Sequence, residues 1–217
     1  MKKLLLGTAL SVWALGFLIP TTANAAVIGS AYFVLEAVAQ NAVIGFAHGA
    51  PNATFSVPNG PINFTNGGNA NLGLGAFLAS SPGEITLTGT ALDLARALDT
   101  GTSGTILELT GSVSVINGQT FTVNHDDGLQ LKIGSLLVVD KPGATSPVLT
   151  TVTYTGPTGT FAFDLVYGEC CGGSAVLRTS LPLISGGGAL VPEPATLAIL
   201  GTAFLGIGAV RRWRTRA

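Results

Sequence analysis

Two apolar segments without any charge, one near each end of the 217-residue chain, limit the part that can fold as a domain in water. The first, Leu4–Ile19, follows two lysines and ends at Pro20. Ala23–Ala25 then supplies the small-x-small pattern of a signal-peptidase site. We therefore predict a secretory signal peptide over residues 1–25. The alternative is an uncleaved membrane helix, which the proline and the small residues disfavour.

The second apolar segment, residues 195–210, predicts a transmembrane helix. Its 16 residues would span roughly 24 Å, slightly less than a hydrocarbon core of about 30 Å. Flanking apolar residues or a locally thinned bilayer would close the difference. Basic tails stay on the cytoplasmic side, so residues 211–217 are expected inside and the preceding domain outside. The basic residues of this tail are Arg211, Arg212, Arg214 and Arg216.

The residues before this helix form a recognisable pattern. Val191, Pro192, Glu193 and Pro194 precede the apolar stretch, which ends at the arginine cluster. This order resembles the PEP-CTERM sorting signal. The resemblance implies export, an inner-membrane anchored intermediate, and recognition by an exosortase-type sorting enzyme that passes the protein to the cell surface or extracellular matrix. Residues 187–194 would be an extended linker, because proline fixes φ. The alternative is an ordinary membrane anchor with a chance Pro-Glu-Pro.

Residues 26–186, between the apolar ends, are enough for one extracellular domain. They contain ten acidic and four basic residues, a net charge of −6. A nucleic-acid partner is not expected, because there is no basic patch to neutralise phosphates. Divalent cations suit this charge.

The patterning of this region predicts an all-β, antiparallel β-sandwich ectodomain. Short Val-, Thr- and Leu-rich runs alternate with turn residues at 8–12-residue spacing. We expect one hairpin over residues 112–123 around Asn117-Gly118, a second over 129–139 around Gly134-Ser135, and a third pair from strands 148–154 and 160–167. The other expected elements are strands at 30–38, 43–46, 54–57, 84–88, 105–110 and 175–181, a short helix within 90–99, and a loop at 60–75.

The run from Phe121 to Ile133 contains His125-Asp126-Asp127-Gly128 between two strands. Together with Gly159-Thr160-Phe161 and Tyr167-Gly168-Glu169, it resembles the core of the protective-antigen domain, a β-sandwich. The resemblance covers residues 105–182. In lectin members of that family paired aspartates hold Ca²⁺, so it implies that Asp126 and Asp127 are metal ligands.

Other readings of Asp126 and Asp127 stay open. Two carboxylates do not satisfy Ca²⁺, which takes 6–8 oxygens, so Asn124, Asp140, Glu169, carbonyls or water would complete the shell. Adjacent strand residues also point to opposite faces, so the backbone must leave strand geometry, for instance through a cis peptide. We favour instead a turn in which Gly128 takes a positive φ and the aspartates cap backbone N–H groups.

Cys170 and Cys171 are the only cysteines. Export places them in an oxidising compartment, where a strained vicinal disulfide in a glycine-rich turn is our preferred interpretation. Intermolecular bonds and free thiols are the alternatives. The spacing does not suit structural zinc, which needs separated pairs.

These features favour a non-enzymatic protein of the cell surface or extracellular matrix that binds extracellular polysaccharide or serves as a structural element, with Ca²⁺ as its candidate cofactor. An enzyme acting on extracellular polysaccharide is a second hypothesis. Asp126 and Asp127 are too close together to be the opposed carboxylates of a glycosidase, which lie at least about 5 Å apart. Ice binding is a third, although the sequence has no threonine ladder of fixed period.

Overall fold

The computed structural model describes residues 27–58 and 61–184. The predicted signal peptide, the linker, the transmembrane helix and the basic tail lie outside these residues. The described part is all-β with antiparallel sheets, as predicted, and it includes three helices of four or five residues. None of the helices within it is long and apolar enough to cross a membrane.

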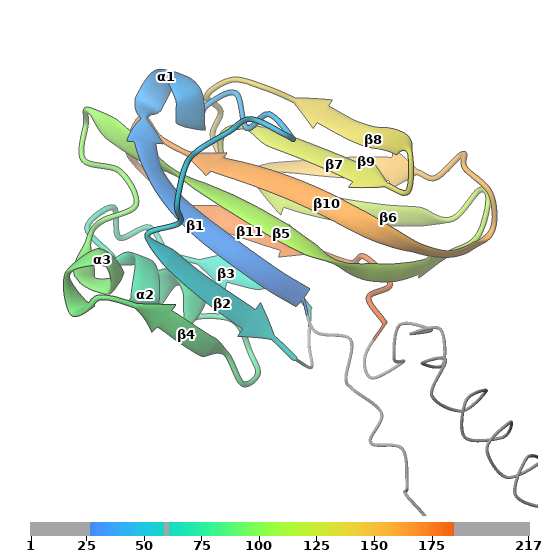
Figure 1. The fold of residues 1–217 in the computed structure, drawn as a ribbon. Helices are drawn as coiled ribbons and strands as arrows, with labels where there is room; N and C mark the ends of the chain where they lie inside the picture. The colour runs from blue at the N-terminus through green and yellow to red at the C-terminus, as the bar shows by residue number, and fades with distance from the viewer. Residues whose placement is uncertain (1–26, 59–60, 185–217) are drawn as a thin grey trace, which may run out of the picture.

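Two sheets form the domain (Figure 1). The larger has the order β4 (Thr86–Gly89), β2 (Ala53–Val57), β1 (Val27–Leu35), β5 (Ser103–Val115), β10 (Gly159–Glu169), β7 (Leu129–Ile133) and β8 (Leu136–Lys141). The smaller has the order β3 (Asn63–Thr65), β11 (Val176–Thr179), β6 (Thr120–His125) and β9 (Val148–Thr153). The helices are α1 (Glu36–Ala39), α2 (Leu74–Leu78) and α3 (Ala91–Ala95).

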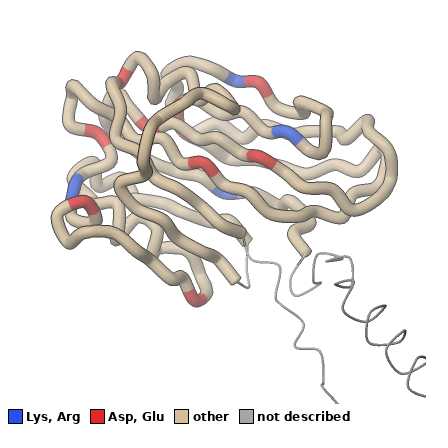
Figure 2. Tube along the Cα trace, in the orientation of Figure 1, with Lys and Arg blue, Asp and Glu red and all other residues tan. Residues whose placement is uncertain are grey.

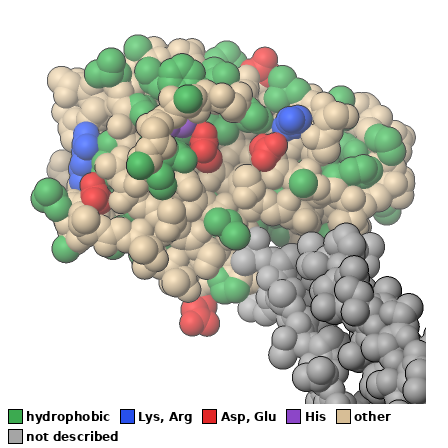
Figure 3. Space-filling model, in the orientation of Figure 1, with side chains coloured by type: hydrophobic (Ala, Val, Ile, Leu, Met, Phe, Trp, Pro, Cys, Tyr) green, Lys and Arg blue, Asp and Glu red, His purple; other side chains and the backbone are tan. Residues whose placement is uncertain are grey.

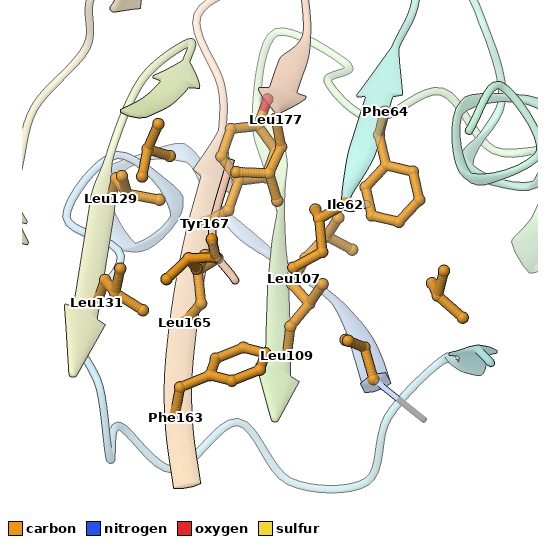
Figure 4. Packing of buried hydrophobic residues seen from close by; sticks show 14 of the residues in the cluster. Ile62, Phe64, Leu107, Leu109, Leu129, Leu131, Phe163, Leu165, Tyr167 and Leu177 are labelled. Atoms are coloured by element: carbon orange, nitrogen blue, oxygen red, sulfur yellow. The ribbon is translucent and has the colours of Figure 1, made fainter. Parts of the chain in front are cut away.

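The hydrophobic core fills the space between the two sheets. Buried and less buried positions alternate along β6 and β7, because successive side chains of a strand point to opposite faces. Figure 4 shows how side chains from β5, β10 and β7 meet those of β3 and β11 in this core. Those it labels are Ile62, Phe64, Leu107, Leu109, Leu129, Leu131, Phe163, Leu165, Tyr167 and Leu177.

Two of the expected hairpins are wrong in their pairing. The strands on either side of Asn117-Gly118 belong to different sheets, since β5 pairs with β1 and β10 while β6 pairs with β11 and β9. Of the two central residues of this turn, only Gly118 has a positive φ, and the Gln119 N–H donates to the Ile116 carbonyl at 2.9 Å. This is the geometry of a type II turn. Likewise β9 and β10 lie in different sheets. Both connections therefore pass from one sheet to the other.

Of the other expected elements, some form with shifted bounds and some do not form. β7 and β8 pair as the predicted hairpin around Gly134. The runs 105–110 and 112–115 form a single strand, β5. The expected strand at 43–46 is absent from the described structure, and the expected loop at 60–75 contains β3 and the first residues of α2. The expected strand over 30–38 ends at Leu35, and α1 begins at the next residue, Glu36.

A short segment, residues 36–42, packs on the outer face of the larger sheet. Ala39 and Ala42 form a small second core with Ile106, Val166 and Cys170. This cover explains why the last five residues of β10 are buried on both faces. Glycines allow the contact: a Cβ on Gly168 would lie 1.7 Å from the Ala39 carbonyl oxygen.

Charges are sparse along the chain (Figure 2). On the face seen in Figure 3, one acidic group lies beside a histidine and another near a basic group. In the described residues His48 Nε2 and Glu108 Oε1 are 3.4 Å apart, and Asp164 pairs in register with Lys132. The 3.4 Å contact does not have hydrogen-bond geometry.

Candidate functional site

The paired aspartates lie where the chain passes from the smaller sheet to the larger one. β6 ends at His125 and β7 begins at Leu129. No described peptide bond is cis, and Asp127 leaves strand geometry with a φ of 58°. The prediction of a positive φ at Gly128 is therefore wrong. Gly128 is required for space instead, because a Cβ there would lie 2.2 Å from the Gln40 carbonyl oxygen.

The Asp127 carboxylate holds two distant segments together. Its Oδ1 accepts a hydrogen bond from the Thr145 N–H at 2.9 Å, and its Oδ2 accepts one from the Cys170 N–H at 2.7 Å. Burial raises the pKa of Asp127, and these two N–H groups oppose that increase by favouring the charged form. Asp127 thus caps backbone groups in the β8–β9 connection and after β10.

Asp126 has a different environment. It is 4% exposed, and no described side chain donates a hydrogen bond or forms an ion pair to its carboxylate. Burial, and then the Asp127 charge, raise its pKa to about 7, while the Asp127 backbone N–H opposes this. A buried carboxylate with so little compensation is costly in its charged form. A cation beside it would favour the charged form.

Glu169 adds a third buried carboxyl group. Its pKa is raised to about 9, mainly by burial and also by the charges of Asp127, Asp126 and Asp99. The Tyr167 hydroxyl, which donates a hydrogen bond to Glu169 Oε2 at 2.5 Å, opposes this increase. Tyr167 is wholly buried, and burial followed by the Glu169 charge raises its pKa well above the ordinary value. Acidic groups from three parts of the chain thus influence each other's protonation.

His125 is a packing residue with a defined tautomer. Its Nδ1 lies 2.8 Å from the Asp127 carbonyl oxygen, which can only accept, so Nδ1 carries the proton. Its Nε2 lies 3.1 Å from the Thr150 hydroxyl. Burial lowers the pKa of His125, so the neutral ring joins the aspartate turn to β9.

Cys170 and Cys171 form a vicinal disulfide directly after β10. Cys171 has a φ of 64°, and Gly172 and Gly173 after it also have positive φ. Potential ligand atoms of Asp127 and the two cysteines lie within 4.8 Å of one another. Because both sulfurs are bonded to each other, they offer no thiolate to a metal.

The structure brings together some residues that sequence reasoning named and separates others. Glu169 lies near the aspartates. Asp140 instead accepts a hydrogen bond from Gln130 Nε2 at 2.8 Å, on the other side of the larger sheet. Asn124 lies on the outer face of the smaller sheet. Sequence reasoning missed Thr145, because nothing local links it to an aspartate 18 positions away.

The described residues provide some, but not all, of the oxygen ligands that a cation such as Ca²⁺ requires. Asp126 offers a carboxylate with little compensation, and Asp127 keeps lone pairs beyond the two it gives to N–H groups. No third described Asp, Glu, His or Cys atom lies within 4.8 Å of ligand atoms of both. A Ca²⁺ ion here would therefore take most of its oxygens from backbone carbonyls and water.

Comparison with known proteins identifies the C-terminal signal. Residues 190–212 match the PEP-CTERM protein-sorting motif, which confirms the resemblance seen in the sequence. This motif indicates export through a membrane-anchored intermediate to the cell surface, and it implies processing by an exosortase. The search of curated proteins found no significant match.

Several solved structures are similar to this chain. The PA14 sugar-binding domain from an RTX adhesin is 20% identical, covers 76% of this chain and 99% of its own, and has a TM-score of 0.50. The PA14 domain of the MpAFP antifreeze protein is 18% identical over 74% of this chain and 87% of its own, with a TM-score of 0.48. A β-glucosidase from Kluyveromyces marxianus is 15% identical over 70% of this chain and 16% of its own, with a TM-score of 0.38.

The adhesin domain shows that the fold is of the PA14, or protective-antigen, type. The likeness extends well beyond residues 105–182, the part recognised from the sequence, because it covers 76% of the chain.

Proposed function

We propose that this PEP-CTERM-sorted chain is a non-enzymatic protein of the cell surface or extracellular matrix whose PA14-type domain binds extracellular polysaccharide with the help of Ca²⁺ at Asp126 and Asp127. The observation that carries the proposal is the buried carboxylate of Asp126, which has a second carboxylate beside it and no ion-pair partner among the described residues. The sorting motif gives the location in which a polysaccharide would be met.

Electrostatics support a cation rather than another ligand at this turn. The pKa of Asp126 is raised to about 7 and that of Glu169 to about 9, and Asp127 contributes to both increases. A nearby positive charge reverses such shifts, because it favours the ionised carboxylates. Carboxylate and carbonyl oxygens are also the ligands that Ca²⁺ prefers.

The chain's own residues prepare this site. The N–H groups of Thr145 and Cys170 hold the Asp127 carboxylate in one orientation, and the His125 ring supports its backbone carbonyl. Asp126 would be the main charged ligand, since no distant N–H group in the described structure binds its carboxylate. Bound Ca²⁺ would supply a positive centre for sugar hydroxyl oxygens. The adhesin domain with this fold is described as sugar-binding.

Calorimetric titration of the full chain with Ca²⁺ in detergent tests the metal. We expect saturable binding that Asp126→Asn abolishes and that Asp164→Asn leaves unchanged. Asp164 is the matched control, because it is an aspartate on the outer face of the larger sheet. If the wild-type chain takes up no Ca²⁺, the metal part of the proposal is wrong and a structural role remains.

Glycan binding with and without a chelator tests the ligand class. We expect neutral oligosaccharides to bind in the presence of Ca²⁺ and to be released by the chelator. Binding that is indifferent to the chelator would contradict the role of the ion. Hydrolysis of a polysaccharide that Asp127→Asn eliminates would favour the enzyme instead.

Secretion experiments test the sorting. The protein with its last 27 residues should reach the surface only in cells that contain the exosortase. Identical location of the full and shortened proteins would contradict this part of the proposal.

A further inference from the structure

The outer face of the smaller sheet carries very little formal charge. Strands β3, β11, β6 and β9 contain one residue with a formal charge, Arg178 on β11. Arg178 is exposed, and in the described part of the chain no carboxylate lies within 4.0 Å of it. The outer face of the larger sheet differs, since it carries Glu108, Asp164 and Lys132. Arg178 is thus a single cation on a neutral polar surface.

The strand register places two amides beside this arginine. Arg178 pairs with Asn63 on β3 and with Asn124 on β6, and Asn124 pairs in turn with Leu149 on β9. Opposed residues of neighbouring antiparallel strands have Cβ atoms about 4.5–5.5 Å apart. A row of amide, guanidinium, amide and leucine therefore runs across the sheet.

This row lines a groove of about 350 Å³, which Pro61, Thr122 and Ser180 also border. The Asn63 side-chain oxygen is buried and accepts no hydrogen bond in the described structure. Leu149 is 62% exposed at the other end of the row. The groove thus combines a cation, two flanking amide side chains and an apolar edge.

We propose that this groove binds an oligosaccharide segment that carries one carboxylate, a uronic acid among neutral sugars. The planar guanidinium of Arg178 binds a carboxylate through two parallel hydrogen bonds. Asn124, on one side, bonds the hydroxyl groups of the sugar as donor and acceptor, and the amide nitrogen of Asn63, on the other side, donates to them. Leu149 contacts an apolar C–H face of the neighbouring sugar.

Charge complementarity favours a sparsely charged ligand over a polyanion. The groove has one cation, and residues 26–186 have a net charge of −6. A nucleic acid presents one phosphate per nucleotide and needs several cations to neutralise them. A sugar chain with isolated carboxylates matches a single guanidinium.

This groove does not use Asp126 or Asp127. The inference rests on the proposed polysaccharide ligand, whose chemical class it narrows, and its test does not depend on Ca²⁺. A failure of the metal site and a failure of the groove are therefore distinguishable.

The test uses the full chain in detergent, with a chelator present throughout so that no Ca²⁺ is available to Asp126 and Asp127. The chain is titrated by calorimetry with an oligosaccharide that contains one glucuronate and with the same oligosaccharide after reduction of its carboxyl group to an alcohol. We expect the acidic form to bind, and the reduced form and the Arg178→Gln variant each to bind roughly tenfold or more weakly, because a charge-assisted bond is lost. Arg178→Lys should retain part of the affinity. Asp126→Asn should change nothing under these conditions.

Lys132→Gln is the matched control, since it removes the same charge from the outer face of the larger sheet. Unfolding curves establish that each variant is folded. The proposal is wrong if the acidic and reduced sugars bind equally, or if the wild-type chain and Arg178→Gln bind equally. It is also wrong if Lys132→Gln weakens binding as much as Arg178→Gln, or if no binding occurs at millimolar sugar. Tighter binding of single-stranded DNA than of the glucuronate sugar would also overturn it.

Discussion

Asp126 and Asp127 are neighbours in the sequence, yet their side chains have different tasks. The positive φ of Asp127 turns its carboxylate toward two backbone N–H groups, from the β8–β9 connection and from the residue after β10. Asp126 is buried, and no distant residue that the structure describes donates a hydrogen bond to its carboxylate; only the adjacent Asp127 N–H opposes its raised pKa. Asp127 therefore joins separate parts of the chain, whereas Asp126 does not.

Asp127→Asn tests the structural task. Asparagine tolerates a positive φ, but its amide group has only one acceptor oxygen for two donors. We expect a loss of about 1–3 kcal/mol in the free energy of unfolding, measured by urea denaturation. Asp164→Asn, the control on the outer face of the larger sheet, should stay within about 0.5 kcal/mol of wild type. Equal stability of the two variants would show that the two N–H caps contribute little.

At the scale of elements, the segment 36–42 determines which glycines the larger sheet must contain. Gly128 and Gly168 lie beneath the backbone carbonyl groups of Gln40 and Ala39, and neither has a positive φ. Gly168 also donates its N–H to the Gly128 carbonyl at 2.8 Å. Segment 36–42 can approach the strands because these two glycines have no side chain, and their conformational freedom is not needed.

Gly168→Ala tests this close contact. The new methyl group would meet the Ala39 carbonyl oxygen, so we expect a loss of about 3 kcal/mol in unfolding free energy. Gly143→Ala is the comparison, because Gly143 has a φ of 105° and open space around it. That variant should lose only the cost of the backbone conformation, about 1–2 kcal/mol. The reverse order of the two losses would contradict a packed segment 36–42.

At the scale of the whole molecule, the buried acids make stability depend on pH. The folded-state pKa values of Asp126, about 7, and of Glu169, about 9, exceed the ordinary values of 3.8 and 4.5. Between the ordinary and the raised values the folded state binds more protons than the unfolded state, so stability must decrease as pH rises.

We therefore expect the calcium-free chain to lose stability progressively from about pH 4 to about pH 9. The loss should be about 2 kcal/mol or more, allowing for partial screening by solvent. Thermal unfolding at a series of pH values measures it. Asp126→Asn should flatten the curve between about pH 4 and 7, and saturating Ca²⁺ should do the same if it binds there. A stability that rises from pH 5 to 8 would contradict the raised pKa values.

Several features of this protein follow from local chemistry alone. The Pro-Glu-Pro pattern before an apolar run identifies the sorting signal without any fold. Alternating apolar residues predict strands such as β6 and β7, because a strand in a sandwich buries every second side chain. The hairpin around Gly134 also follows from local turn chemistry. These features need no knowledge of distant residues.

The pairing of the strands and the hydrogen bonds of the acidic turn depend instead on residues far apart in the chain. The turn at Asn117-Gly118 looks like a hairpin, but β5 and β6 join different sheets, because pairing depends on apolar faces far along the chain. The partners of Asp127 come from 18 and 43 positions away. The row of Asn63, Arg178 and Asn124 likewise exists only through strand register. Local patterns specify elements, whereas sites arise from long-range contacts that burial and backbone hydrogen bonding select.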